Sequence, residues 1–242
     1  MKVIGILESC FREKFGTPRQ GSLVPEAPAR LRIKAEFLPE YSLLGLEFSH
    51  VWLIFQFHLN TNKTFRPKIH PPRLRGKTIG VFATRSPHRP SPIGLTLAKI
   101  ERIEGDTLYL SGVDLVNSTP ILDIKPYIPG CDRPRRVRSG WVARCPAPRL
   151  KVVFTPGAQA DLKRVVPARM RAKFKRILAA SLSHDPRNPR DHAQLRDDKE
   201  MGFFLFHYDT YFRVIRGAAV ISEIVAADEA ARQRPALGPG LA

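Results

Sequence analysis

The sequence predicts an α+β protein in which an N-terminal β-barrel-like domain precedes a small C-terminal α+β domain. Up to Pro146, short apolar or alternating runs are bounded by Gly, Pro, Asn and Asp, with no helical periods between them. This pattern is typical of a barrel or sandwich and argues against a doubly wound sheet. After Pro156 the spacing becomes helical, and three further strand-like runs follow.

The strands of the first part come from runs of five to nine residues and one shorter run. They are Val3–Leu7, Val51–Phe57, Thr78–Phe82, Leu95–Ile103, Thr107–Val113 and Trp141–Ala143. Glu104-Gly105-Asp106 predicts a hairpin turn between two of them, because Gly tolerates a positive φ. Two proline-rich segments, 66–72 and 86–92, cannot be central strands, since proline lacks the ladder donor. We expect them to be loops, where functional residues tend to lie.

The second part predicts two helices over Ala158–Val166 and Pro167–Ser183, with Pro167 in a first-turn position. An apolar stripe at helical spacing supports the second helix; its members are Phe174, Ile177, Leu178 and Leu182. Three strands should follow, over Gly202–Tyr208, Tyr211–Arg216 and Ala218–Ala226. The turns between them are expected at 209–210 and 216–217.

The predicted domains are a barrel over 1–148, a small α+β domain over 149–232, and a disordered tail rich in Pro, Gly and Ala over 233–242. A 43% hydrophobic content excludes wholesale disorder. No run of eighteen apolar residues occurs, so no membrane span is expected. The start lacks a long apolar stretch and a small-residue cleavage site, so no signal peptide is expected.

The cysteines and histidines do not predict a metal site. Three widely spaced cysteines, Cys10, Cys131 and Cys145, favour neither a disulfide framework nor a zinc site, and a reducing cytoplasm is the expected location. Cys10 has no nucleophile signature and is expected to be a small buried residue. His50 and His58 would share one face of a strand, where they line a pocket or have a structural role.

The charge is strongly basic, with 40 Lys and Arg against 22 Asp and Glu, a formal net charge of +18. No acidic residue lies between Glu47 and Glu101, a window that holds nine basic residues. Further basic clusters run over 133–149 and, on the predicted helices, over 163–176. Because surfaces normally mix the two signs, this pattern favours a nucleic-acid partner. The alternative is a solvated basic face.

Several common catalytic motifs are missing, among them GxGxxG, GxxxxGK[ST], HExxH and GxSxG. The distinctive stretch is instead GVFATRSPHRPSPIG at 80–94. Its prolines stiffen a loop that presents Arg85 and Arg89, which fits recognition of a carboxylate or phosphate. An arginine-bearing structural turn explains the same spacing.

This stretch, with SGVDLVNSTP at 111–120 and LDIKPY at 122–127, resembles the TsaA-like, or TrmO, family of tRNA methyltransferases. The resemblance extends to EKFGTPRQGSLV, GLEFSHVWLIFQFH and RPKIHPPRLRGKTIG. In the small domain it includes HDPR at 184–187 and YFRV at 211–214. Ser91 stands where the family usually has Asn, so a role for that side chain is in doubt.

The resemblance implies an S-adenosyl-L-methionine-dependent enzyme whose cofactor fold is a barrel. Family members methylate N6 of the adenosine just 3′ of the anticodon in a threonine tRNA, where that base already carries an N6-threonylcarbamoyl group. They work as homodimers with the cofactor near the subunit interface. By motif, the implied cofactor residues are Arg19, Gln20, Gly21, Gln56, Phe57, Arg85, Leu95, Ser111, Gly112, Val113 and Asp114.

The resemblance also suggests individual roles. Asp114 would bind the ribose hydroxyls or the amino group of the cofactor, and Arg85 its carboxylate. Phe57 and Leu95 would enclose the adenine. The N6 atom of the modified base must lose a proton, and Asp123 and Tyr127 are the candidate acceptors. The alternative role for Asp123 is a buried ion pair with a neighbouring Arg. The residues expected to bind tRNA phosphates are Arg89, Lys125, Lys163 and Arg171.

Two other functions fit the same sequence. A non-enzymatic RNA-binding barrel would clamp the anticodon stem with its basic face and use no methyl donor. Alternatively, the cofactor is retained and the acceptor is another RNA or a small molecule. Binding of S-adenosylmethionine separates the first of these from the methyltransferase, and substrate trials separate the second.

Overall fold

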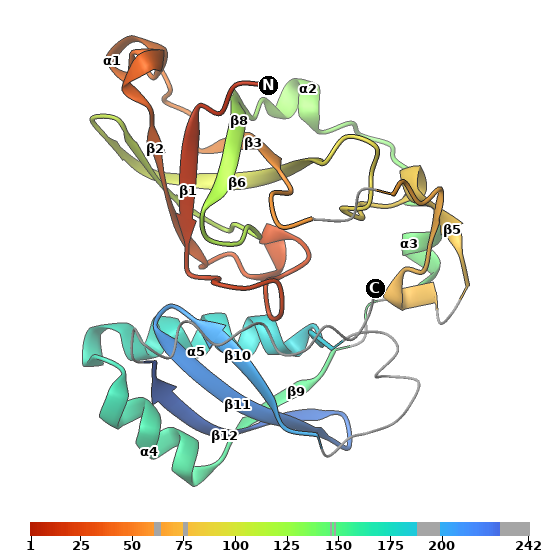
Figure 1. Cartoon of the computed structure of the whole chain (residues 1–242), viewed down its shortest axis with the longest axis vertical. Helices are drawn as coiled ribbons and strands as arrows, with labels where there is room; N and C mark the ends of the chain where they lie inside the picture. The colour runs from red at the N-terminus through yellow and green to blue at the C-terminus, as the bar shows by residue number, and fades with distance from the viewer. Residues whose placement is uncertain (61–63, 75–76, 146, 148, 188–198, 228–242) are drawn as a thin grey trace.

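The computed structural model describes residues 1–60, 64–74, 77–145, 147, 149–187 and 199–227. Within these residues, six antiparallel strands close a barrel in the order β1-β2-β7-β6-β3-β8 (Figure 1). They are β1 (Gly5–Ser9), β2 (Pro28–Ile33), β3 (His50–Gln56), β6 (Ile93–Glu104), β7 (Thr107–Ser111) and β8 (Thr119–Pro126). Closure leaves no barrel strand with an unpaired edge.

Alternation along the strands forms the barrel core. In β3, Val51, Leu53 and Phe55 are buried. The β6–β7 hairpin turns at Gly105 with a φ of 57°, a conformation that favours glycine. Both the strand and the hairpin turn agree with the sequence prediction.

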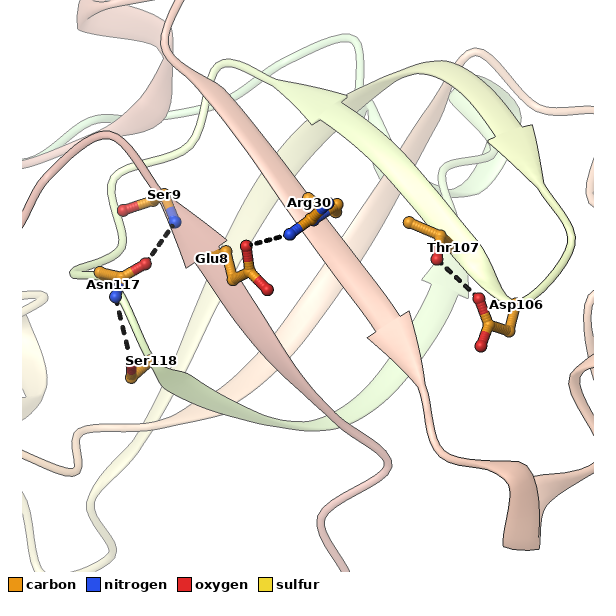
Figure 2. A network of polar contacts seen from close by, with 7 residues as sticks. All are labelled: Glu8, Ser9, Arg30, Asp106, Thr107, Asn117 and Ser118. Carbon is orange, nitrogen blue, oxygen red and sulfur yellow. Dashed lines mark hydrogen bonds and ion pairs between the residues drawn. The ribbon is translucent and has the colours of Figure 1, made fainter. Parts of the chain in front are cut away.

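The outer wall of the barrel carries cross-strand polar pairs (Figure 2). Glu8 of β1 lies opposite Arg30 of β2, and their side chains form an ion pair at 2.6 Å. The Asn117 side chain accepts a hydrogen bond from the backbone of Ser9 at 3.1 Å and so ties the loop before β8 to β1. These contacts help to fix the register of strands that alternate in burial.

The loops between and after the barrel strands contain short 3₁₀ turns, short helices and two short strands. The 3₁₀ turns are η1 (Gly21–Leu23), η2 (Ala35–Phe37), η3 (Pro72–Leu74) and η4 (Val81–Ala83). The short helices are α1 (Pro39–Ser42), α2 (Pro129–Asp132) and α3 (Trp141–Arg144). β4 (Lys68–Ile69) and β5 (Ile79–Gly80) form a small sheet of their own. Figure 1 shows β5 and α3 together at the right, away from the barrel axis.

The C-terminal part is a four-stranded sheet with two helices; both helices and three of the strands were predicted, and the strand Lys151–Phe154 was not. Its strand order is β10-β11-β12-β9, and β9 pairs with β12 in parallel. The elements are β9 (Lys151–Phe154), α4 (Pro156–Val165), α5 (Ala168–Ser183), β10 (Met201–Leu205), β11 (Tyr208–Ile215) and β12 (Ala218–Ala226). Thr155 caps α4 by accepting a hydrogen bond from the Ala158 backbone at 3.1 Å, and Pro156 occupies the first turn.

A second hydrophobic core joins the C-terminal part to the N-terminal segment 10–27. Cys10, Phe11, Val24 and Ala27 are buried in the same cluster as α5 and the C-terminal strands. The backbone NH of Phe206 donates to the carbonyl of Cys10 at 2.8 Å. Figure 1 shows α5 on the side of the C-terminal sheet that faces the barrel. The segment between β1 and β2 therefore packs into the C-terminal core and not into the barrel core.

An ion pair also links α5 to the segment between β1 and β2. The Arg176 guanidinium of α5 binds Glu26 through two hydrogen bonds, at 2.7 and 2.8 Å. This bond holds the pKa of Glu26 below its usual value. The shared core contains residues from both sides of position 148. The predicted domain boundary at 148 stays a prediction. The predicted tail 233–242 lies outside the described residues.

Three local predictions were wrong. Trp141–Ala143 belongs to helix α3, because the Trp141 indole NH donates to the carbonyl of Ala83 at 2.8 Å and no barrel strand pairs with this segment in the described residues. Within Thr78–Phe82 only β5 is extended, and η4 follows it. Residues 209–210 lie inside β11, where Thr210 is fully buried, and the turn falls instead at Phe206, which has a φ of 58°.

The structure also contains strands that the sequence reasoning does not predict. β2 begins at a proline and carries two arginines, yet Ala29, Leu31 and Ile33 alternate inward. β8 follows the positive-φ residue Ser118, and its barrel neighbours are β1 and β3. In the described part of the chain, no helix is both long enough and apolar enough to cross a membrane.

Candidate active site

Two glycine turns meet at the predicted cofactor site. Gly21 opens η1 after the turn that contains Arg19 and Gln20, and Gly112 follows the end of β7 with a φ of 69°. A Cβ atom on Gly21 would lie 1.8 Å from the Gly112 carbonyl oxygen. Only glycine allows the two backbones to approach this closely. The contact joins the 19–21 turn to the 111–114 segment, two of the motifs that the sequence predicts to act together.

Asp114 lies at this junction and is partly buried. Burial raises the pKa of its carboxyl above the usual value, while hydrogen bonds from the Thr96 side chain and the Gly21 backbone and the positive charge of Arg85 lower it. Its Oδ1 atom is buried and has no hydrogen-bond partner within the described residues. A buried carboxylate oxygen without a donor is costly, and a ligand hydroxyl or ammonium group would satisfy it.

Asp114→Asn is therefore expected to stabilise the free protein at neutral pH. With its pKa raised in the folded state, the ionised Asp114 lowers the free energy of unfolding above that pKa, and this cost disappears as both states become protonated. Denaturant unfolding from neutral pH down to about pH 3, below the ordinary pKa of an aspartate, should show a gain for the variant at neutral pH that disappears at the acid end. Lower stability than the wild type at neutral pH would contradict this account.

The control for this measurement is Asp106→Asn. Hydrogen bonds from Thr107 and Arg32 hold the pKa of Asp106 below its usual value. Removing that charge should therefore lower stability at neutral pH, the opposite direction from Asp114→Asn.

Arg85 reaches the same cluster from the proline-rich loop. Its guanidinium donates to the Gln20 side-chain oxygen. Its charge also acts on Asp114. The exposed Arg85 side chain thus lies between the 19–21 turn and Asp114, and its remaining donors are available to an anionic group.

The loop that presents Arg85 is fixed by its own hydrogen bonds. The Val81 backbone NH donates to Pro67 at 2.9 Å, and the Thr84 hydroxyl donates to the carbonyl of Val81 at 2.7 Å. The Arg89 guanidinium donates to the Thr84 carbonyl at 2.9 Å. Arg89 is thus engaged within its loop, and phosphate binding by this residue stays a prediction.

The apolar part of the predicted site lies where β3 and β6 pair. The Phe57 backbone NH donates to the Pro92 carbonyl at 2.8 Å, which brings Gln56 and Phe57 against the start of β6. The Phe57 ring meets Phe55 edge-on at 4.9 Å. Leu95, which follows in β6, is 55% exposed. Leu95 pairs with Ile54 on the outward face of these strands, whereas Phe55 is buried opposite Gly94, so enclosure of one adenine ring by Phe57 and Leu95 stays a prediction.

Two predicted cofactor side chains point elsewhere. Arg19 donates to the Asp185 carbonyl at 3.4 Å, and burial is the main cause that lowers the pKa of its guanidinium. The Ser111 hydroxyl donates to the Glu101 carboxylate at 2.5 Å. Cofactor contact by the side chains of Arg19 and Ser111 therefore stays a prediction.

The predicted proton acceptors lie at the β3–β8 seam. Asp123 pairs with Lys125 at 2.9 Å and is 47% exposed, so it forms a surface ion pair with a lysine and not the buried pair with an arginine that was its alternative role. The Tyr127 ring packs edge-on against Trp52 at 5.9 Å. The ring of His50, at the start of β3, packs against Tyr127, whereas His58 lies beyond the last residue of β3. Proton transfer by Asp123 or Tyr127 stays a prediction.

The other predicted phosphate ligands are on the C-terminal helices. Arg171 donates to the carbonyls of Val166 and Lys163 and thereby satisfies the end of α4. Lys163 is exposed on α4. Within the described parts of the chain, no three His, Cys, Asp or Glu side chains come together as a candidate metal site.

Thr96 is the site residue that sequence reasoning misses. It is 5% exposed and lies between Gly94 and Ala98 on the inward side of β6. A lone polar residue at an inward strand position is the signal that could have found it, because such a residue needs a hydrogen-bond partner. Here that partner is Asp114.

A closed antiparallel barrel whose two glycine turns, partly buried carboxylate and arginine meet at one loop cluster defines a β-barrel protein with a candidate small-molecule site. Residues 6–133 match the family model described as "tRNA-methyltransferase O N-terminal domain". This chain belongs to that family.

Relatives with curated names agree with the assignment. The tRNA (adenine(37)-N6)-methyltransferase of Rattus norvegicus is 55% identical over 137 residues, which are 55% of this chain and 32% of the rat protein. The Escherichia coli protein of the same name is 35% identical over 76% of this chain and 80% of its own length. A Pseudomonas aeruginosa protein, "Putative S-adenosylmethionine-dependent methyltransferase RcsF", is 41% identical with the same two coverages.

The solved structures match over almost the whole chain. The crystal structure of TrmO from Pseudomonas aeruginosa has a TM-score of 0.76 and 31% identity, over 93% of this chain and 97% of that one. The rat, mouse and human relatives are longer, and this chain spans about a third of their length. The match to these mammalian relatives covers 55% of this chain, whereas the match to the Pseudomonas aeruginosa structure covers 93% of it.

Proposed function

We propose that this protein transfers a methyl group from S-adenosyl-L-methionine to N6 of threonylcarbamoyladenosine next to the anticodon of a threonine tRNA. The names of the relatives support the reaction class, the tRNA substrate and the methyl donor. The observation that carries the assignment to this site is the buried Oδ1 atom of Asp114, which has no donor among the described residues.

The residues around Asp114 fit the chemical groups of the cofactor. Asp114 would accept hydrogen bonds from its ribose hydroxyls or its ammonium group, and Arg85 would bind its carboxylate bidentately. Gly21 and Gly112 would leave their backbones open to close approach. Phe57 and Leu95 would enclose the adenine. When bound, the cofactor supplies an electrophilic methyl group.

The task of the chain is to align the acceptor and to take up a proton. The N6 atom of the modified base is a urea-type nitrogen and a poor nucleophile until its proton is lost, so an acceptor near it accelerates transfer. Asp123 and Tyr127 are the proposed acceptors. Alignment of donor and acceptor supplies most of the remaining rate enhancement.

The proposal extends to assembly and location. We expect a homodimer in the cytoplasm, with the barrel over 1–148 and the α+β unit over 149–232 as its two domains. Lys125, Lys163, Arg89 and Arg171 are the proposed phosphate ligands, and their contribution should fall as salt rises. The names of the relatives do not favour the alternative of a basic barrel that binds RNA without chemistry.

Isothermal titration of the purified protein with S-adenosylmethionine tests the cofactor, and mass spectrometry of tRNA after incubation tests the reaction. We expect saturable binding near one site per chain and a methyl-sized mass increase on the modified adenosine. A tRNA lacking the threonylcarbamoyl group serves as the matched control. RNA binding by a folded protein with neither cofactor heat, alone or with tRNA present, nor methyl transfer would favour the non-enzymatic barrel.

A further inference from the structure

Two aromatic side chains are exposed to solvent on the segment between β3 and β6, which we call the loop arm. Phe82 in η4 is 72% exposed, and Phe65 is 45% exposed. Their ring centroids lie 6.4 Å apart with 30° between the ring planes. Large exposed aromatic residues that pair with each other offer a flat apolar surface, which is rare without a partner.

The backbone on both sides of Phe82 is held by hydrogen bonds, and Arg89 lies over its ring. Its neighbour Val81 donates to Pro67 at 2.9 Å, and Ala83 accepts from the Trp141 indole at 2.8 Å. The Arg89 guanidinium carbon lies 5.7 Å from the Phe82 ring centroid. A fixed backbone means that little entropy is lost when a ligand contacts the ring.

The surroundings of this aromatic pair are basic. It lies in the window between Glu47 and Glu101 that contains no acidic residue. Trp141 links the pair to the segment 133–140, in which every residue is exposed. That segment carries Arg133, Arg135, Arg136 and Arg138. Figure 1 shows α3, at the end of this segment, beside β5 of the loop arm.

We propose that Phe82, supported by Phe65, is a stacking site for an unpaired nucleobase of the RNA substrate, with Arg133–Arg138 binding the phosphates that flank it. This inference rests on the proposed function and adds a base-binding subsite outside the cofactor cluster. An exposed aromatic face next to cationic side chains matches single-stranded RNA, which offers base faces and phosphates together.

Charge decides between RNA and a second copy of the chain. The chain carries a formal net charge of +18, and a symmetric contact through this surface would bring arginines against arginines. Like charges oppose such a contact, whereas an RNA loop neutralises them and releases counterions.

The test is binding of a fluorescent anticodon stem–loop to Phe82→Ala, Phe82→Trp and Phe48→Ala at several salt concentrations. Phe48 is 39% exposed and belongs to the loop before β3, so it is the matched control. Phe82→Ala should bind on the order of 10-fold or more weakly. The slope of affinity against salt should not change, because no charge is removed. Phe82→Trp should retain affinity, since indole stacks as well.

Arginine variants provide the complementary readout. Arg135→Ala and Arg136→Ala should each reduce the salt slope, by about 0.7–0.9 for each phosphate that the variant no longer binds. A stem–loop with 2-aminopurine in the loop should be quenched by the wild type and not by Phe82→Ala. Thermal unfolding of Phe82→Ala should match the wild type, because the replaced side chain is mostly exposed.

The outcomes are separable. If the wild type binds and methylates tRNA while Phe82→Ala binds with unchanged affinity, the inference is overturned and the proposed function stands. If Phe82→Ala changes the oligomeric state and leaves RNA affinity intact, the occupant is a second copy, and the inference is again overturned. A wild type that binds no stem–loop would remove the proposed function and the inference together.

Discussion

Arg85→Ala is expected to lose S-adenosylmethionine binding, with affinity falling by about 100-fold or more. Hydrogen bonds to charged groups contribute about 1.5–3 kcal/mol, and a bidentate carboxylate contact provides two of them at once. Arg85 also supplies the positive charge that acts on Asp114, so its loss makes the ionised carboxyl less favourable. Calorimetric titration of the variant measures the effect.

The control for Arg85→Ala is Arg66→Ala. Arg66 is an exposed arginine in the same acid-free window, so its loss removes one charge from the same region. Its affinity for the cofactor should stay within about twofold of the wild type, since exposed charges are screened by salt. Equal affinities for the Arg85 and Arg66 variants would refute the assignment of Arg85.

Gly21→Ala is expected to damage both folding and the site. The new Cβ atom would lie 1.8 Å from the Gly112 carbonyl oxygen, an overlap with backbone that side-chain rotation cannot relieve. Overpacking of this kind typically costs about 1–3 kcal/mol of stability. The separation of the two turns would also move Gln20 away from Arg85. Unfolding by denaturant and cofactor titration should both report losses.

Gly130→Ala is the matched substitution. Gly130 lies in α2, and a Cβ atom there would meet nothing within 4 Å. Its stability and cofactor affinity should equal or slightly exceed those of the wild type, because alanine favours helix more than glycine. If both glycine variants behaved alike, the contact between Gly21 and Gly112 would not be essential.

The sequence predicted elements whose signal is local. Alternation identified β3, turn chemistry identified the hairpin at Gly105, and helical spacing identified α4 and α5. It did not predict β2, where a leading proline and outward arginines obscure the inward alternation. It read Trp141–Ala143 as a strand, because the bond from Trp141 to Ala83 joins residues 58 positions apart and leaves no pattern in the local sequence.

The candidate site shows the same division. Motif resemblance named Gln20, Gly21, Arg85 and Asp114, and the structure brings these residues together. Their contact with a cofactor stays a prediction. Resemblance did not name Thr96, whose importance comes from a hydrogen bond between two strand segments. It also could not show that Arg171 and Arg89 are engaged by backbone carbonyls, since such contacts depend on side-chain direction.

The shared core has a consequence for the order in which the molecule is completed. Phe11 and Val24 leave the ribosome early, yet their packing partners include Phe203 and Ile224, close to the end of the described chain. Contacts this distant in sequence cannot form until both segments have been synthesised. A nascent chain that stopped after β8 would contain every barrel strand, but the segment around its 19–21 turn would lack its packing partners from the C-terminal part. The packing that supports the 19–21 turn is therefore complete only after synthesis has passed β12.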